Sequence, residues 1–150
     1  MANVKIGSYA SWSGKFVENL DAAKQLSRGD SGKVFMVDQG SAFTVNLPQV
    51  STKIAGWSCE FIVKTADTND VHIMAYGLTS SGGTTGDAET VILKEMATTD
   101  VGAATATSQD GVILKSGATV GDSISVFTDG TSWYCTSSVA DAAHSDDIDA

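Results

Sequence analysis

The segment from Gly121 to Cys135 constrains the fold more than any other, because it has the pattern of two strands joined by a tight turn. Asp129-Gly130 is a residue pair that a two-residue type I′ turn favours, since both central positions need a positive φ. Such a turn would fix the register of the two strands beside it. The pairs expected across the hairpin are Thr128 with Thr131, Val126 with Trp133, Ile124 with Cys135 and Ser125 with Tyr134.

The two faces of this hairpin differ in character. Successive side chains of a strand point to opposite faces, so one face is expected to be apolar and the other half polar and half aromatic. The apolar face would hold Ile124, Val126, Trp133 and Cys135, and the other face Ser123, Ser125, Phe127, Ser132 and Tyr134. We expect Phe127 and Tyr134 to contact a second protomer, because aromatic side chains are enriched at interfaces. The alternative is an ordinary solvent-facing surface with two scattered aromatic residues.

The rest of the chain repeats the strand pattern. With 15 glycines and one proline in 150 residues, and with abundant Ser and Thr, the composition favours strands and tight turns over helices. Apolar runs, alternating or continuous, predict further strands at 34–37, 43–47, 57–64, 71–76, 90–96 and 112–115, with a loop at 80–86 and a connection at 98–110. We therefore expect an all-β fold, a single β-sandwich or jelly-roll-like domain of about eight short strands over residues 29–136.

Different patterns flank this domain. Residues 1–28 are expected to form an extended N-terminal arm, with a short helix over 19–26 that Asn19 would cap. Exposed aromatic side chains on a segment without its own core favour docking on another surface, and folding back on the domain is the alternative. The arm residues expected to bind a partner are Lys5, Tyr9, Trp12, Lys15 and Phe16. Residues 137–150 are acidic and weakly hydrophobic, which predicts a flexible tail.

The net charge of −9 disfavours nucleic acid as a partner, because no basic patch is present to release phosphate counterions. The charge is uneven along the chain. Residues 1–33 hold five bases against three acids, whereas the segment from Asp122 to Ala150 holds six acids and no Lys or Arg. This asymmetry suits docking on a charged surface, although such patterns often serve only solubility.

The N-terminal residues show no signal peptide, and no apolar stretch approaches the length of a membrane span. Synthesis in a reducing cytosol is the simplest interpretation. The two cysteines, Cys59 and Cys135, both fall on faces expected to point inward. We therefore expect them to be buried and unpaired rather than joined in a disulfide.

Two short motifs invite functional interpretations that the rest of the chain does not support. Gly29-Asp30-Ser31-Gly32 copies the loop around a chymotrypsin-like nucleophile, but that chemistry needs a histidine base, an orienting aspartate and an oxyanion hole. The only histidines are His72, on an expected strand, and His144, in the tail. Arg28-Gly29-Asp30 spells the integrin-binding tripeptide, but three residues match often by chance, and a turn before the strand at Lys33 is the better explanation.

No cofactor and no metal is expected. His144 lies near three aspartates of the tail, but their spacing matches no EF-hand loop. The sequence contains no P-loop, no zinc-type Cys/His spacing, no Gly-rich dinucleotide fingerprint and no convincing carboxylate pair for glycoside hydrolysis. We therefore expect that the protein is not an enzyme.

Short segments spread along the chain carry a resemblance to a known family. They are Leu26-Ser27, Asp30 to Phe35, Val45 to Pro48, Ala55 to Trp57, Phe61 to Val63, Gly121-Asp122, Asp129 to Thr131 and Trp133-Tyr134. In this order they resemble the small β-rich domain of tailed-phage capsid decoration (cement, or head auxiliary) proteins and of related head-fibre and tail-fibre modules. The resemblance covers about residues 26–136, and each segment is short and degenerate. The arm and the tail lie outside it.

The resemblance implies a homotrimer on the outer surface of the virion, made in the host cytoplasm, that ties neighbouring major capsid protein subunits together. It supplies no catalytic residues. Placement around a symmetry axis would raise avidity without new contacts in each chain. Two other classes stay open: a receptor- or glycan-binding fibre module, and an enzyme that would depend on Ser31.

Overall fold

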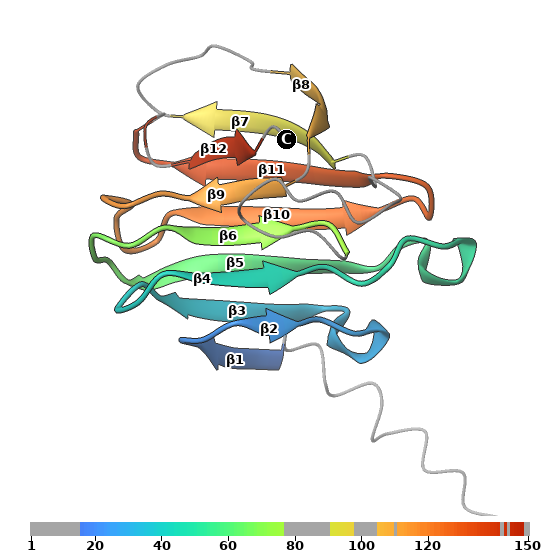
Figure 1. Cartoon of the computed structure of the whole chain (residues 1–150), viewed down its shortest axis with the longest axis horizontal. Helices are drawn as coiled ribbons and strands as arrows, with labels where there is room; N and C mark the ends of the chain where they lie inside the picture. Colours follow the sequence, from blue (N-terminus) through green and yellow to red (C-terminus); the bar gives the residue numbers. More distant parts are fainter. Residues whose placement is uncertain are drawn as a thin grey trace, which may run out of the picture.

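A computed structural model describes residues 16–76, 91–97, 105–109, 111–141, 143 and 145–148. Two sheets pack face to face in a sandwich, and the described residues contain no α-helix, so the expected all-β fold is confirmed (Figure 1). Four of the expected arm residues, Lys5, Tyr9, Trp12 and Lys15, lie outside the described residues. So do the expected loop at 80–86 and His144.

The larger sheet has seven strands in the order β1-β3-β5-β10-β11-β7-β8. Their bounds are β1 Phe16–Leu20, β3 Lys33–Asp38, β5 Ser58–Thr65, β10 Ser123–Thr128, β11 Trp133–Val139, β7 Val91–Ala97 and β8 Thr105–Gln109. The smaller sheet has five strands in the order β12-β9-β6-β4-β2. These are β12 Ser145–Ile148, β9 Gly111–Leu114, β6 Val71–Met74, β4 Phe43–Asn46 and β2 Lys24–Gln25. Two short 3₁₀ helices, η1 (Arg28–Asp30) and η2 (Thr52–Ile54), lie in loops.

The first six strands alternate between the two sheets. Each strand therefore returns to its own sheet in the same direction, and β1, β3 and β5 are parallel neighbours, as are β2, β4 and β6. The second half of the chain adds antiparallel pairs, including β5 with β10, β10 with β11, and β6 with β9. The sequence pattern predicted strands but not this parallel winding.

The core lies between the sheets and is rich in aromatic and aliphatic side chains. Phe35 stacks on Phe61 with ring centroids 5.3 Å apart, and Trp57 meets Trp133 edge to face, also at 5.3 Å. Cys59 and Cys135 are both buried and free of disulfides, as expected. Burial raises the pKa of the Cys135 thiol to about 12 and that of Cys59 further. Both thiols therefore stay protonated and act as small apolar side chains.

The hairpin has the predicted faces but not the predicted register. Val126 pairs with Cys135 and Phe127 with Tyr134, so the loop comprises residues 129–132 instead of two residues. The carboxylate of Asp129 explains the longer loop, because its Oδ1 accepts hydrogen bonds from the backbone N–H groups of Thr131 and Ser132, at 2.7 and 2.9 Å. The shift is by two residues, so every side chain keeps its face.

The expected helix over 19–26 is wrong. Asn19 and Leu20 belong to β1, and Lys24 and Gln25 form β2. Leu20 and Leu26 are only 3% and 2% exposed, since the segment crosses between sheets and delivers both side chains to the core. An eight-residue helix is marginal in isolation, so strand pairing and burial decide its conformation.

The strands also extend beyond the expected domain bounds of 29–136. On the N-terminal side, β1 and β2 lie within the segment assigned to the arm. On the C-terminal side, β11 continues to Val139 and β12 pairs antiparallel with β9, although this region was expected to be a flexible tail. Backbone pairing accounts for β12, since hydrophobicity alone gave no sign of it. The connection expected at 98–110 likewise contains β8.

Gly111 provides a test of the pairing between β6 and β9. A Cβ at this position would lie 2.5 Å from the carbonyl oxygen of Ile73 and 2.8 Å from Sδ of Met74. We expect Gly111→Ala to lower the free energy of unfolding by about 1–3 kcal/mol or more, because this space cannot open without moving the backbone. Urea denaturation would measure it. Gly29→Ala is the matched control, because its Cβ would meet nothing closer than 3.7 Å; an equal loss in both variants would contradict the prediction.

Candidate functional site: an aromatic contact surface

The outer face of the seven-stranded sheet carries one exposed and one partly exposed aromatic side chain. Phe127 on β10 and Tyr134 on β11 point away from the core, as the sequence predicted, and the observed register makes them partners. Their rings stack with centroids 4.9 Å apart and planes 18° apart, and Phe127 is 49% exposed. Stacked rings on a paired sheet form a rigid apolar surface, which loses little conformational entropy when another molecule covers it.

The hairpin loop fixes the orientation of this aromatic pair. The hydroxyl of Tyr134 donates a hydrogen bond to Oδ2 of Asp129 at 3.1 Å, while Oδ1 of the same carboxylate accepts the bonds of the loop. Hydrogen bonds from Thr131 and Ser132 hold the pKa of Asp129 below its usual value. The bond to Asp129 raises the pKa of Tyr134. The hydroxyl therefore remains a donor, and one carboxylate shapes the loop and positions the ring.

A shallow depression of about 230 Å³ lies beside Phe127 on the same face. Polar side chains line it together with Phe127, namely Lys33 of β3, Ser58 and Glu60 of β5, Ser125 of β10 and Thr136 of β11. Ser58 is the register partner of Phe127 on the side opposite Tyr134. The depression can therefore receive a small group that combines an apolar face with hydroxyl groups.

A second depression, of about 200 Å³, lies in the loops at the same end of the sandwich. Arg28 of η1 and Lys53 of η2 line it together with Ser31 and Gly56. Neither Arg28 nor Lys53 makes an ion pair within the described part of the chain. The loop of the hairpin lies against these residues, because Gly56 N–H donates to the carbonyl of Thr128 at 2.8 Å. The exposed aromatic pair and the two cations therefore belong to one end of the molecule.

A cluster of charged side chains joins the two sheets at the edge formed by β1 and β2. Glu18 of β1 accepts hydrogen bonds from Lys24 of β2 and from Lys33 of β3, the latter at 2.7 Å. Lys33 also donates to Asp30 at 2.7 Å, and the ammonium of Lys24 lies 5.2 Å from the ring centroid of Phe35. These contacts fasten the edge strands β1 and β2, so the cluster has a structural role.

The Asp30 carboxylate should make stability fall in acid. Burial alone would raise its pKa, but hydrogen bonds from Lys33 and Ser27 outweigh burial and lower the pKa from 3.8 to about 2. A lowered folded-state pKa stabilises the fold above the unfolded value, and this contribution is lost as the pH falls from about 4 to about 2. We expect a loss of roughly 2 kcal/mol, seen as a lower urea midpoint. In Asp30→Asn this part of the acid dependence should vanish; an unchanged profile would contradict the assignment.

The structure also shows the surroundings of the integrin-type tripeptide and of the protease-like loop around Ser31. Asp30 is buried and hydrogen-bonded to Ser27 and Lys33, so Arg28-Gly29-Asp30 does not present a free carboxylate. Oγ of Ser31 accepts a hydrogen bond from Ser58 N–H at 3.3 Å. Ser58 belongs to the seven-stranded sheet, whereas His72 lies on β6 of the five-stranded sheet. Ser31 and His72 therefore do not come together as a nucleophile and its base.

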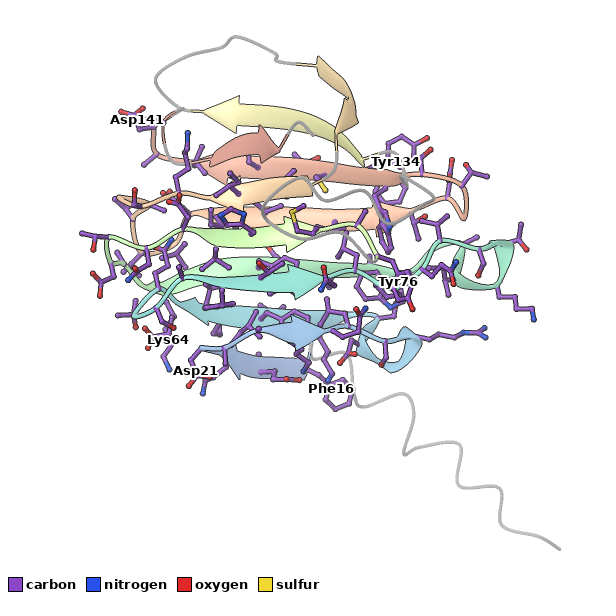
Figure 2. The ribbon with its side chains drawn as sticks, in the orientation of Figure 1. Phe16, Asp21, Lys64, Tyr76, Tyr134 and Asp141 are labelled. Carbon is purple, nitrogen blue, oxygen red and sulfur yellow. The ribbon has the colours of Figure 1, made fainter. Side chains whose placement is uncertain are left out.

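Of the five arm residues expected to bind a partner, Phe16 is the one that the structure describes. It begins β1 and is 63% exposed, and its neighbour Val17 is 66% exposed. Figure 2 shows Phe16, Tyr76 and Tyr134 at the same end of the sandwich. Phe16 begins the edge strand β1, and β3 and β5 separate it from the aromatic pair on β10 and β11.

No protein-family model matches the chain, and no curated protein matches it. In the described residues, no group of three or more His, Cys, Asp or Glu side chains is arranged to hold a metal ion. None of the helices described has the length and hydropathy needed to cross a bilayer.

Sequence reasoning missed the basic depression and the ion cluster. Arg28 and Lys53 are 25 positions apart in the chain, and only the packing of η1 beside η2 brings them together. The ion cluster consists of residues that are close in sequence, namely Glu18, Lys24, Asp30 and Lys33. The expected helix over 19–26 gave no reason to bring Glu18 and Lys24 together, whereas the strands β1 and β2 do so. Neither set has a spacing that signals a site.

Proposed function

We propose that this protein is a non-enzymatic structural component of a tailed-phage virion. It decorates the outer surface of the capsid as a homotrimer and ties major capsid protein subunits together. The observation that carries the proposal is the rigid, outward-facing Phe127–Tyr134 pair, since a stacked aromatic surface on a paired sheet suits burial by another protein. The resemblance of residues 26–136 to decoration proteins supplies the biological setting.

Two different surfaces of the protein make the two kinds of contact. Phe127 and Tyr134 contact a neighbouring protomer, and the arm residues Lys5, Tyr9, Trp12, Lys15 and Phe16 bind the capsid. A decoration protein needs both kinds of contact, because multivalent attachment around a symmetry axis raises avidity. The exposed ring of Phe16, at the start of the edge strand β1, is consistent with an arm that leaves the domain apart from the protomer contact.

The two surfaces can be tested separately with purified protein and with capsids that lack it. Tyr9→Ala with Trp12→Ala should reduce capsid occupancy at unchanged oligomeric mass. Phe127→Ala should raise the dissociation constant between protomers by about tenfold or more, as for a truncated interface hot spot. Tyr76→Ala is the matched control, because Tyr76 is 46% exposed and belongs to neither surface.

Two outcomes would overturn the proposed function. One is the absence of this chain from purified virions of a phage that encodes it, measured by mass spectrometry. The other is a full-length chain that fails to co-sediment with capsids at any concentration. If a chain without residues 1–16 still decorates capsids at full occupancy, the arm assignment alone is wrong.

A second candidate function follows from the depression beside Phe127. An aromatic ring bordered by Ser58, Ser125, Thr136 and Glu60 has the composition of a saccharide site, where a sugar ring stacks on the aromatic face and its hydroxyls meet polar side chains. The protein would then be a glycan-binding head- or tail-fibre module. Binding on a glycan array with a dissociation constant below about 1 mM, lost in Phe127→Ala, would favour it over the protomer contact.

A further inference from the structure

The two ends of the sandwich carry opposite chemistry. Figure 2 shows Phe16, Tyr76 and Tyr134 at one end and Asp21, Lys64 and Asp141 at the other. We call the first the aromatic end, defined by Phe127, Tyr134, Arg28 and Lys53. We call the second the acidic end, defined by Asp21, Asp67, Asp70, Asp141 and Val120, where four carboxylates outnumber the cation Lys64.

The acidic end gathers carboxylates from three separate connections between strands. Asp21 follows β1, Asp67 and Asp70 lie between β5 and β6, and Asp141 follows β11. Asp21, Asp67 and Asp141 are exposed, and Asp70 is partly exposed. Val120, in the loop between β9 and β10, is 69% exposed among them. This end therefore presents an apolar side chain within a negative surface.

Hydrogen bonds hold the acidic end rigid. Asp70 accepts a bond from Ser116 N–H at 2.6 Å, and Asp122 accepts bonds from Thr119 N–H and Ala140 N–H, both at 2.8 Å. The carbonyl of Asp67 accepts a bond from Gly117 N–H. The loops between β5 and β6 and between β9 and β10 and the end of β11 are thus tied together, so the surface exists before any partner binds.

The aromatic end is its chemical complement. Phe127 and Tyr134 offer an apolar surface, and Arg28 and Lys53 offer two cations that make no ion pair in the described residues. Two copies of the same end would place Arg28 and Lys53 of one copy near those of the other, with only Asp129 of the hairpin loop to offset them. Opposite ends instead bring carboxylates to cations and Val120 to an aromatic surface.

We propose that copies of this chain associate end to end, with the aromatic end of one copy on the acidic end of the next. Val120 packs on Phe127 and Tyr134, while Asp67 and Asp141 face Arg28 and Lys53. A contact of one aromatic end with one acidic end is heterologous, so it closes into a ring such as a trimer or continues as an open chain. This inference rests on the homotrimer of the proposed function and names the surface that the Phe127–Tyr134 pair would meet.

The charges give this contact a characteristic salt dependence. Exposed ion pairs contribute little each, and counterions screen them, while the aromatic contact does not weaken with salt. We expect self-association to weaken severalfold between about 50 mM and about 500 mM NaCl, measured by sedimentation velocity or light scattering. The overall charge of −9 works against association, so local complementarity has to exceed this repulsion.

Charge reversals at the two ends provide the decisive test. Lys53→Glu should weaken association by about two- to tenfold, and Arg28→Glu with Lys53→Glu by more, because attraction becomes repulsion. Lys64→Glu is the matched control. It changes the net charge equally but makes the acidic end more negative, so association should be unchanged or stronger. Adding Asp67→Lys and Asp141→Lys to the double variant should restore association.

Any one of three results would contradict the end-to-end contact. These results are a monomer at every concentration and salt, a closed symmetric dimer, or equal weakening by Lys53→Glu and Lys64→Glu. Circular dichroism of each variant confirms that it is folded before association is measured. A monomer that still decorates capsids would reject this contact and leave the capsid role intact, whereas a salt-sensitive trimer that binds no capsid would do the reverse.

Discussion

Trp133→Ala should lower the free energy of unfolding by about 3–5 kcal/mol, the largest expected loss from any single truncation in the core. Trp133 is fully buried, and its ring meets Trp57 edge to face at 5.3 Å. Removing the indole leaves a cavity in the core beside Trp57 that the sheet cannot close, since β11 is fixed by β10 on one side and β7 on the other. Small domains have a total stability of about 5–15 kcal/mol, so this variant keeps only a part of it.

Urea denaturation followed by circular dichroism would measure this loss. Tyr134→Ala is the matched control, since it removes a neighbouring aromatic ring from the outer face of the same strand. We expect it to cost much less, because Tyr134 is partly exposed and its truncation opens no internal cavity. Equal losses in the two variants would mean that the inner and outer faces of β11 are wrongly assigned.

The assignment of these faces is the part of the fold that sequence predicted best. Alternation alone placed Val126 and Trp133 inward and Phe127 and Tyr134 outward, and the structure confirms all four. It did so even though the register was wrong by two residues, because the period of a strand is two. Local patterns decide which face a side chain occupies, whereas the turn decides which residues pair.

The parallel winding of β1 to β6 had no signal in the sequence. Each of these strands pairs with a strand two elements away in the chain, and no short-range pattern encodes that spacing. The prediction of a helix over 19–26 was wrong for the same reason. The conformation of this segment depends on β3 and β4, which pair with β1 and β2. The basic depression was likewise invisible, because Arg28 and Lys53 meet only in the folded chain.

Gln39→Glu should destabilise the protein strongly at neutral pH, because the side chain of Gln39 is completely buried among carbonyl oxygens. Its Nε2 donates towards the carbonyls of Asn69, Leu114 and Lys115 at 3.1, 3.3 and 3.2 Å. A carboxylate in the same place has no donor, faces three acceptors and is itself an unpaired buried charge. We expect a loss of about 3–5 kcal/mol near pH 7, measured by urea denaturation.

Acidification should recover part of this loss. Burial raises the folded-state pKa of the introduced carboxyl above the unfolded value of about 4.3, so the destabilisation is full above the folded pKa and shrinks as the pH falls towards the unfolded one. The protonated acid supplies one O–H donor to the carbonyls that Nε2 served. The difference from wild type at each pH is the quantity to compare, since Asp30 makes both proteins weaker in strong acid.

Gln39→Leu separates the charge from the missing hydrogen bonds. It removes the hydrogen bonds of Nε2 at every pH, so its loss of about 1–3 kcal/mol should not depend on acid in the way that of Gln39→Glu does. If both variants lose the same stability near neutral pH, the carboxyl has reached solvent and the loops there are looser than the structure shows. Because these loops also carry the carboxylates of the acidic end, a folded Gln39→Leu chain should associate more weakly than wild type while Phe127 and Tyr134 remain unchanged.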